Sequence, residues 1–333
     1  IFNQGACAGC HPGDGRGPVE TALTRFSIGG DPVLPLGGPQ LQDAAIPGVA
    51  PETLPAGVEV SRRLPPPVFG VGLIENIPVA TILSREDVND DDADGISGRA
   101  HWVTPADFVP AHEIGGGPGP QLGRFSRKAQ VSSLIQQVTE AYHQDMGITS
   151  DFLPVENPNP QAGGFAAGDV VADPEIPASI VLETVVYVRL LAPPETAVST
   201  PLIEEGRALF NQIGCADCHT PVMQTAAGPI PALSEVDVHL YSDLLLHDMG
   251  PDLADGRTDG DASGSEWRTA PLWGMRIAGD FLAGEVPLLH DGRTTDLHEA
   301  IVFHGGEAAA SRDGYLALTS EQEAAVREFV RTR

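Results

Sequence analysis

Apolar residues recur at helical spacing in three long stretches of the chain. Residues 176–191 (IPASIVLETVVYVRLL) form a broad apolar face, and the Ala-Pro-Pro-Glu that follows ends the predicted helix at a linker near residues 192–200. Residues 130–144 form a second helical stretch. These runs favour helices as the main elements of the fold.

The third stretch, residues 320–331, predicts an amphipathic helix that closes the chain. Ser320 is its predicted N-cap, with Glu323 at the third helical position. Residues 30–80 instead contain many Pro and Gly and few periodic runs. We therefore expect loops and short strands in that part of the chain.

The chain also contains an internal repeat. Phe2-Asn3-Gln4 aligns with Phe210-Asn211-Gln212, and the pentapeptide CAGCH at residues 7–11 then aligns with CADCH at residues 215–219. In the second copy, residues 201–210 predict a helix with Pro in its first turn and an acidic N-terminal end. The matching helix of the first copy would precede the first residue, so we expect it to have been removed. The repeat predicts two related units.

Both pentapeptides have the pattern CxxCH, which is typical of covalent haem attachment. Two thiols three positions apart can form thioethers to the vinyl groups of haem, and the His that follows can reach the iron. The two motifs use every Cys of the chain. The predicted attachment residues and proximal iron ligands are Cys7, Cys10 and His11 for the first haem and Cys215, Cys218 and His219 for the second.

Other uses of the CxxC pairs fit the sequence less well. Structural zinc pairs usually lie much closer together, and a His directly after both pairs would be a coincidence. Two disulfides or a redox CxxC would also leave both His unexplained. Because thioether attachment takes place outside the cytoplasm, we expect a periplasmic or extracellular protein whose signal peptide has been removed.

Charge and hydropathy narrow the range of partners. The 46 acidic and 19 basic residues give a formal net charge of -27, and no basic cluster could follow a phosphate backbone, so we expect no nucleic-acid partner. An acidic surface favours a small redox protein or a partner cytochrome with a basic surface, although acidic runs are more often only solvated. No run of about 18 apolar residues occurs, so we expect no transmembrane segment.

Short motifs between and after the haem motifs point to one family. They are Asp94-Gly-Ile-Ser-Gly-Arg99, Leu122-Gly-Arg-Phe125, Asp145-Met-Gly-Ile-Thr149, Leu246-His-Asp-Met-Gly250, Pro271-Leu-Trp-Gly274, Leu289-His-Asp-Gly-Arg293 and His304-Gly-Gly-Glu-Ala308. In their order and spacing the chain resembles the di-haem oxidoreductases, also called thiol oxidoreductases. That family is related to bacterial di-haem cytochrome c peroxidases and to the di-haem maturase of methylamine dehydrogenase.

The resemblance implies that an oxidant such as hydrogen peroxide reacts at the first haem and that the second haem supplies electrons. In the peroxidase relatives a Gln and an acidic residue lie over the open face of the first haem, and the matching positions are Gln137 and Asp145. Cleaving an O–O bond requires a base that moves a proton between the oxygens. The two positions are eight residues apart, about two helical turns, so both could share one face. A solvated Gln and a capping Asp are the alternative.

The chain departs from these relatives at the electron relay. They place a Trp between the haems, whereas Arg127 occupies the matching position here. The relay could instead be Trp102, or electrons could pass directly between the haems. No His lies between His11 and His101, so the first haem has no obvious mobile sixth ligand and is expected to be five-coordinate.

The sixth ligand of the second haem differs as well. The Met that ligates this haem in the peroxidases matches Leu289, which cannot bind iron. We predict His290, or failing that His304, as the ligand, and two His ligands tend to give a lower reduction potential than His with Met. The alternative role for His290 is a hydrogen bond to a haem propionate or to the backbone.

An acidic loop is a candidate calcium site. Asp90, Asp92 and Asp94 stand at alternate positions and Gly95 follows, the spacing by which one turn brings three carboxylates to a hard cation. The twelfth position is His101, so only the first half of an EF-hand loop is matched. A solvated acidic turn is the alternative.

The sequence therefore predicts a mainly α fold of two cytochrome-c-like haem domains, residues 1–195 and 196–333, with extensive loops. The predicted function is a peroxidase-like oxidoreductase with two covalently bound haem c groups. Two other classes stay open: an electron-transfer cytochrome without its own substrate, and a haem-dependent maturase or sensor of a partner protein. The coordination of the first haem discriminates between them, since an enzyme needs an open iron position.

Overall fold

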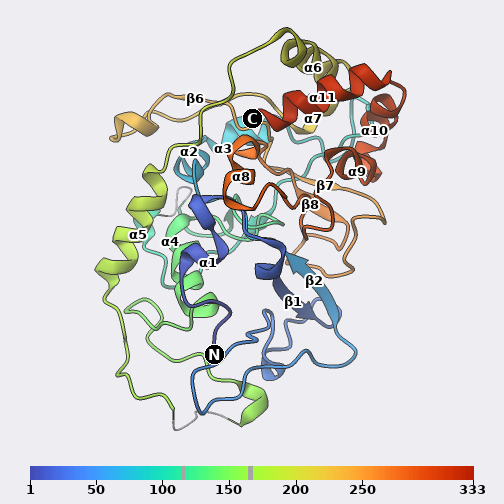
Figure 1. The fold of residues 1–333 in the computed structure, drawn as a ribbon. Coiled ribbons are helices and arrows are strands. Elements are labelled where there is room, and N and C mark those ends of the chain that lie inside the picture. The colour runs from blue at the N-terminus through green and yellow to red at the C-terminus, as the bar shows by residue number, and fades with distance from the viewer. Residues whose placement is uncertain (114–116, 164–167) are drawn as a thin grey trace.

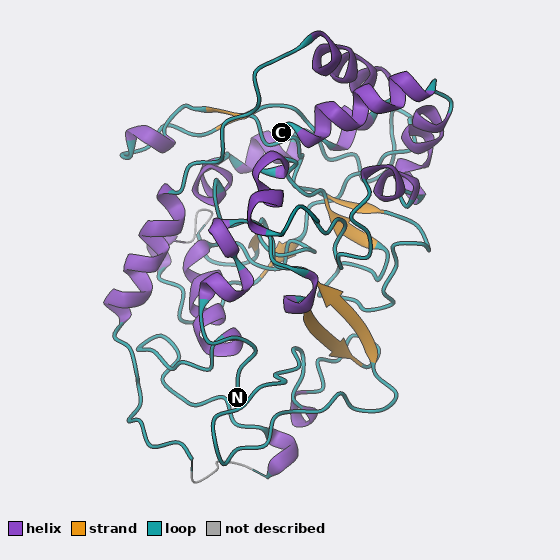
Figure 2. Cartoon of the chain, in the orientation of Figure 1, coloured by secondary structure: helices purple, strands orange, loops and turns teal. Residues whose placement is uncertain are grey.

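The structure, a computed structural model, describes residues 1–113, 117–163 and 168–333. Helices dominate it, and long loops join them, most of all around the N-terminus (Figures 1 and 2). The helices are α1 (Cys7–Cys10), α2 (Val71–Asn76), α3 (Val79–Leu83), α4 (Leu134–Glu140), α5 (Ala178–Leu190), α6 (Pro201–Gln212), α7 (Cys215–Cys218), α8 (Met275–Phe281), α9 (Leu297–Val302), α10 (Ala309–Leu316) and α11 (Ser320–Arg331). The prediction of a mainly α fold is thus confirmed.

The strands are short and pair only with a neighbour. Each pair is antiparallel: β1 (Leu23–Ser27) with β2 (Glu59–Arg63), β3 (Trp102–Val103) with β4 (Gln121–Leu122), β5 (Met223–Gln224) with β6 (Asp237–Val238), and β7 (Leu246–Asp248) with β8 (Glu266–Arg268). Residues 30–80 contain β2 and loops as predicted, and also the helix α2, which their apolar pattern did not reveal.

Helices α6 and α11 pack against each other and form the C-terminal layer of the molecule (Figure 1). The ring centroids of Phe210 and Phe329 are 5.2 Å apart. Gly206 allows the close approach, because a side chain there would meet the Ala325 carbonyl oxygen. Both helices follow the ranges predicted from apolar spacing, and α6 carries the chain directly to the second CxxCH motif.

Two predicted helix boundaries need correction. The N-cap of α11 is Thr319, not Ser320, and Gln322 completes its capping box in place of Glu323. Thr319 is extended and Leu318 before it packs against the α6–α11 cluster, so the cap lies one residue earlier than predicted and the helix begins at Ser320. The helix expected over residues 130–144 begins only at Leu134, after the N-cap Ser133.

The largest hydrophobic cluster joins parts of the chain that lie far apart in the sequence. Ile135 of α4 and Val185 of α5 belong to it, as do Met223 of β5, Val238 of β6 and Leu245. It thus draws on both sides of the predicted boundary near residue 195, and the division into two cytochrome-c-like domains stays a prediction. Among the described residues, no helix is long and apolar enough to cross a membrane.

Candidate haem centres

The second CxxCH motif forms the one-turn helix α7 directly after α6. Gly214 between them has a φ of 84°, a value that side chains disfavour, and Cys215 then packs on the α6–α11 cluster. The Nδ1 atom of His219 lies 2.9 Å from the Tyr241 carbonyl oxygen. This bond keeps the ring proton on Nδ1 and leaves Nε2 to bind a metal. Burial lowers the pKa of His219 to about 4, so the ring is neutral near pH 7.

A cavity of about 210 Å³ lies beside Cys215, Cys218 and His219. Its walls are mostly apolar and include Leu253, Leu272, Leu288, Leu297, Ile301 and Val326. A cavity that presents two thiols, a neutral imidazole and apolar walls suits haem, because the macrocycle is apolar and its iron takes an axial imidazole. The residues of this centre therefore fit the cofactor that the motif implies.

Both candidate sixth ligands line this cavity, but their surroundings differ. His304 is partly buried, and its Nδ1 lies 2.8 Å from the Ala300 carbonyl oxygen, the same arrangement as at His219. The His290 ring stacks on Trp267 with centroids 3.7 Å apart and planes 10° apart. Burial and four nearby cations lower the pKa of His290 to about 2, so it is also neutral.

Three residues that the sequence reasoning missed form a buried ion cluster beside Cys218. His247 lies 2.7 Å from both Asp243 and Glu307, and its Nδ1 is 3.6 Å from the Cys218 sulfur. Burial alone would lower the pKa of His247, but the two carboxylates raise it well above its usual value. His247 and Glu307 belong to the motifs Leu246-His-Asp-Met-Gly250 and His304-Gly-Gly-Glu-Ala308, which the family resemblance had already singled out. Nothing in the sequence showed that these two motifs meet in the fold.

The first CxxCH motif forms α1. Its His11 Nδ1 lies 3.4 Å from the Gly15 carbonyl oxygen, the Pro66 backbone also bonds to the ring, and burial lowers the pKa of the ring. Burial also raises the thiol pKa of Cys10 to about 11 and that of Cys215 to about 12. Redox-active CxxC pairs need a lowered thiol pKa, so these surroundings disfavour the thiol-redox alternative.

Asp145 lies close to the first motif. Its backbone carbonyl accepts hydrogen bonds from Asn3 and Gln4, and its charge acts on both Cys7 and Cys10. Its Oδ1 accepts a 2.6 Å bond from the Gln40 amide. Burial raises the pKa of Asp145 to about 6, although the Gln40 bond acts to lower it. The side chain is therefore a carboxyl group that changes charge near neutral pH.

Gln137 and Asp145 belong to one continuous helical segment. Gln137 lies in α4 and its Oε1 accepts a 3.1 Å bond from Ser126, while Asp145 ends the π-helical turn Ala141–Asp145. An α-helical residue advances by about 100°, and a residue of the wider π-turn by less. The π-turn therefore brings position 145 closer to the face of position 137 than a uniform α-helix would. No direct contact between the two side chains is found among the described residues.

The candidate electron relays lie in different places. Trp102 is in β3 and 45% exposed, whereas Trp267 is buried and lines the cavity of the second motif. Arg127 is buried between the motifs: it lines the same cavity, and its charge acts on His11. The route of the electrons stays a prediction.

In the acidic loop, carboxylates lie close to one another and bond to the loop's own backbone. Asp87, Asp90 and Asp92 offer oxygen atoms within 4.8 Å of one another, a group that contains Asp87 in place of the predicted Asp94. The Asp94 Oδ1 instead accepts a 2.8 Å bond from the Ile96 amide. Calcium binding by this loop stays a prediction, and exposed acidic turns of this kind also occur without an ion.

Two histidine-bearing haem motifs, one beside a titratable carboxyl group and one beside an apolar cavity, define a di-haem redox protein. The chain belongs to the family described as "Di-haem oxidoreductase, putative peroxidase", which matches residues 46–332. The matched stretch includes the second motif but begins after the first. Among solved structures, the chain is similar to the diheme peroxidase BthA from Burkholderia thailandensis E264, with 17% identity, a TM-score of 0.43, and coverage of 98% of this chain and 80% of that one. A search of curated proteins found no match.

Proposed function

We propose that this protein is a di-haem c-type peroxidase in which hydrogen peroxide reacts at the first haem and electrons arrive through the second. The observation that carries the proposal is the partly buried Asp145 carboxyl group beside the first motif. The carboxylates beside the second motif, Asp243 and Glu307, are instead paired with His247. The first motif thus has a carboxyl group whose pKa of about 6 suits it to moving a proton near neutral pH.

When bound, each haem supplies an iron that can exchange electrons, and the first also offers a position for peroxide. The chain supplies the proton chemistry. Gln40 holds Oδ1 of Asp145, and Oδ2 has no hydrogen-bond partner among the described residues. Oδ2 takes the proton from peroxide as it binds and returns it to the departing oxygen. The Gln137 amide helps to orient the peroxide.

The reaction with peroxide should depend on pH through Asp145. Because burial raises its pKa to about 6, the base is protonated and inactive below that pH and available above it. The second-order rate constant should therefore rise with pH and level off above about pH 6. Stopped-flow measurements from about pH 4.5 to 8 would show this profile. Gln40→Ala removes a bond that lowers the pKa, so its midpoint should lie at higher pH; an unchanged midpoint would contradict the assignment.

For the second haem we propose His304 as the sixth iron ligand. A carbonyl fixes the proton of His304 on Nδ1, as at His219, and leaves Nε2 free for the iron. His290 has no such bond among the described residues and stacks on Trp267 instead. The first choice made from sequence was His290, the neighbour of Leu289.

His304→Ala should convert the second haem from low spin to high spin. His290→Ala is the matched control, because it removes an imidazole that lines the same cavity, and it should leave the spin state unchanged. Electron paramagnetic resonance of the oxidised protein distinguishes the two. The reverse pattern would assign the ligand to His290, and two unchanged spectra would exclude both residues.

The proposed function is tested by spectra of the oxidised and reduced protein before and after one equivalent of peroxide. A high-spin first haem whose spectrum changes on addition is the expected result. Two six-coordinate haems that do not respond would favour the electron carrier. Thioether attachment places the proposed enzyme outside the cytoplasm, and its charge of -27 favours a redox partner with a basic surface.

A further inference from the structure

Three buried guanidinium groups lie at the cavity of the second motif without a carboxylate partner. Arg16, Arg127 and Arg268 all line it, and they are 8%, 8% and 9% exposed. Their side chains donate only to backbone carbonyls: Arg16 to Pro287, Arg127 to Leu64, and Arg268 to Ser126 and Thr269. Among the described residues, no carboxylate forms an ion pair with any of the three.

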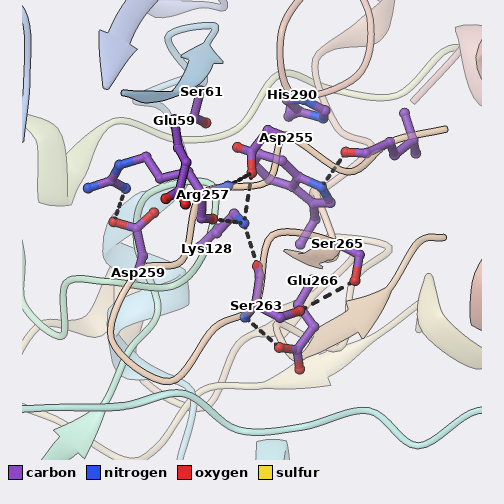
Figure 3. A network of polar contacts seen from close by, with 12 residues as sticks. Glu59, Ser61, Lys128, Asp255, Arg257, Asp259, Ser263, Ser265, Glu266 and His290 are labelled. Carbon is purple, nitrogen blue, oxygen red and sulfur yellow. Dashed lines mark hydrogen bonds and ion pairs between the residues drawn. The ribbon is translucent and has the colours of Figure 1, made fainter. Parts of the chain in front are cut away.

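Other buried cations of the chain form ion pairs with carboxylates. Lys128 is bonded to Asp255, and Arg257 is paired with Asp259, in the network beside His290 that Figure 3 shows. Arg63 also pairs with Asp259. A buried charge is costly unless it is paired, and each of these cations has a carboxylate partner. Arg16, Arg127 and Arg268 have none, and Arg127 lies close enough to the other two for them to repel it.

The electrostatic cost is visible at each of the three. Burial lowers the pKa of Arg16 and of Arg268 to about 10. Burial, together with repulsion from Arg16, Arg268 and Arg63, lowers the pKa of Arg127 well below its usual value. An anion in the space that the cluster faces would offset this cost.

The cluster lies between the two haem motifs. Arg16 follows the first motif by five residues and lines a small hollow with Pro12 and Gly13 as well as the cavity of the second motif. Arg127 acts electrostatically on His11 from one motif and on His290 beside the other. An anionic group attached at either motif would therefore lie within reach of this cluster.

We propose that Arg16, Arg127 and Arg268 bind the propionate carboxylates of haem, with Arg127 placed to serve both haems. This inference rests on the proposed presence of two covalent haems. Propionates are the anionic edge of an otherwise apolar cofactor, and guanidinium groups pair well with carboxylates. Positive charge close to haem also favours the reduced iron, so the cluster raises the reduction potential of the second haem. Arg127 thus has an electrostatic role at the position where the relatives place a Trp.

Arg127→Gln should lower the reduction potential of the second haem while both haems stay attached. Spectroelectrochemical titration measures the potential, and a pyridine haemochrome assay counts the haems. Arg127→Lys keeps the charge and should restore part of the shift. Arg124→Gln is the matched control, because Arg124 is also buried and donates to two carbonyls, those of Ile74 and Ile77, but does not line the cavity. Its potential should remain that of the wild type.

Equal potentials in wild type and Arg127→Gln, with two haems in each, would overturn this inference and leave the proposed function intact. An equal shift in Arg124→Gln would also overturn it, because the effect would then follow from the loss of any buried arginine. A wild-type protein without covalent haem would overturn both proposals, and the haem count identifies that case before any potential is measured.

Discussion

Asp145→Asn is expected to slow the reaction with hydrogen peroxide by about a hundred- to ten-thousand-fold, the usual cost of losing a positioned acid or base. Asparagine keeps the size of the side chain and can still bond to Gln40, but it cannot take up a proton. Haem content and the resting spectrum should not change, since Asp145 is not an attachment residue. Stopped-flow absorbance after mixing with peroxide measures the rate directly.

Glu140→Gln provides the matched control for this experiment. Glu140 is a second carboxyl group of the same helical segment whose pKa is raised by burial, and it accepts a 2.8 Å bond from Gln136. Its replacement should change the rate only slightly, and Gln137→Ala should have an effect smaller than that of Asp145→Asn. An unchanged rate in Asp145→Asn would mean that Asp145 is only a structural residue at the end of the helix.

Local sequence rules predicted the elements that depend on local interactions. The CxxCH motifs, the Pro201 start of α6 and the apolar spacing of α11 each act within a few residues, so one sequence reveals them. Family resemblance then added Gln137 and Asp145. The π-turn at residues 141–145 was not predictable, because apolar spacing does not show whether a backbone amide bonds to the carbonyl four or five residues before it.

Features that depend on distant segments could not be found from the sequence. His247 meets Glu307 across sixty residues of sequence, and Arg16 lines the same cavity as Arg268. Nor does composition distinguish a buried arginine from an exposed one, since arginines are usually at the surface. The choice between His290 and His304 as the iron ligand also depends on the fold. Adjacency to Leu289 favoured His290, whereas the carbonyl that fixes the His304 proton is visible only in the fold.

Removal of one haem at a time should separate the two proposed roles. Cys7→Ala/Cys10→Ala and Cys215→Ala/Cys218→Ala should each retain one covalent haem. The first double variant should not react with peroxide. The second should still react once but should not turn over with an electron donor, because its electrons no longer arrive through the second haem. Haem staining of a denaturing gel, rapid mixing and steady-state assays give the three readouts.

Each double variant serves as the matched control for the other, since both lose two thiols and one cofactor from a protein of the same composition. Circular dichroism would establish that the remaining unit is folded. The expected asymmetry follows from the carboxylates: Asp145 at the first motif is free to exchange a proton, whereas Asp243 and Glu307 at the second are committed to His247. Peroxide reactivity that survives in Cys7→Ala/Cys10→Ala would move the reactive site to the second haem. Normal turnover in Cys215→Ala/Cys218→Ala would show that electrons reach the first haem by another route, and the arginine cluster would then act on a haem outside the catalytic cycle.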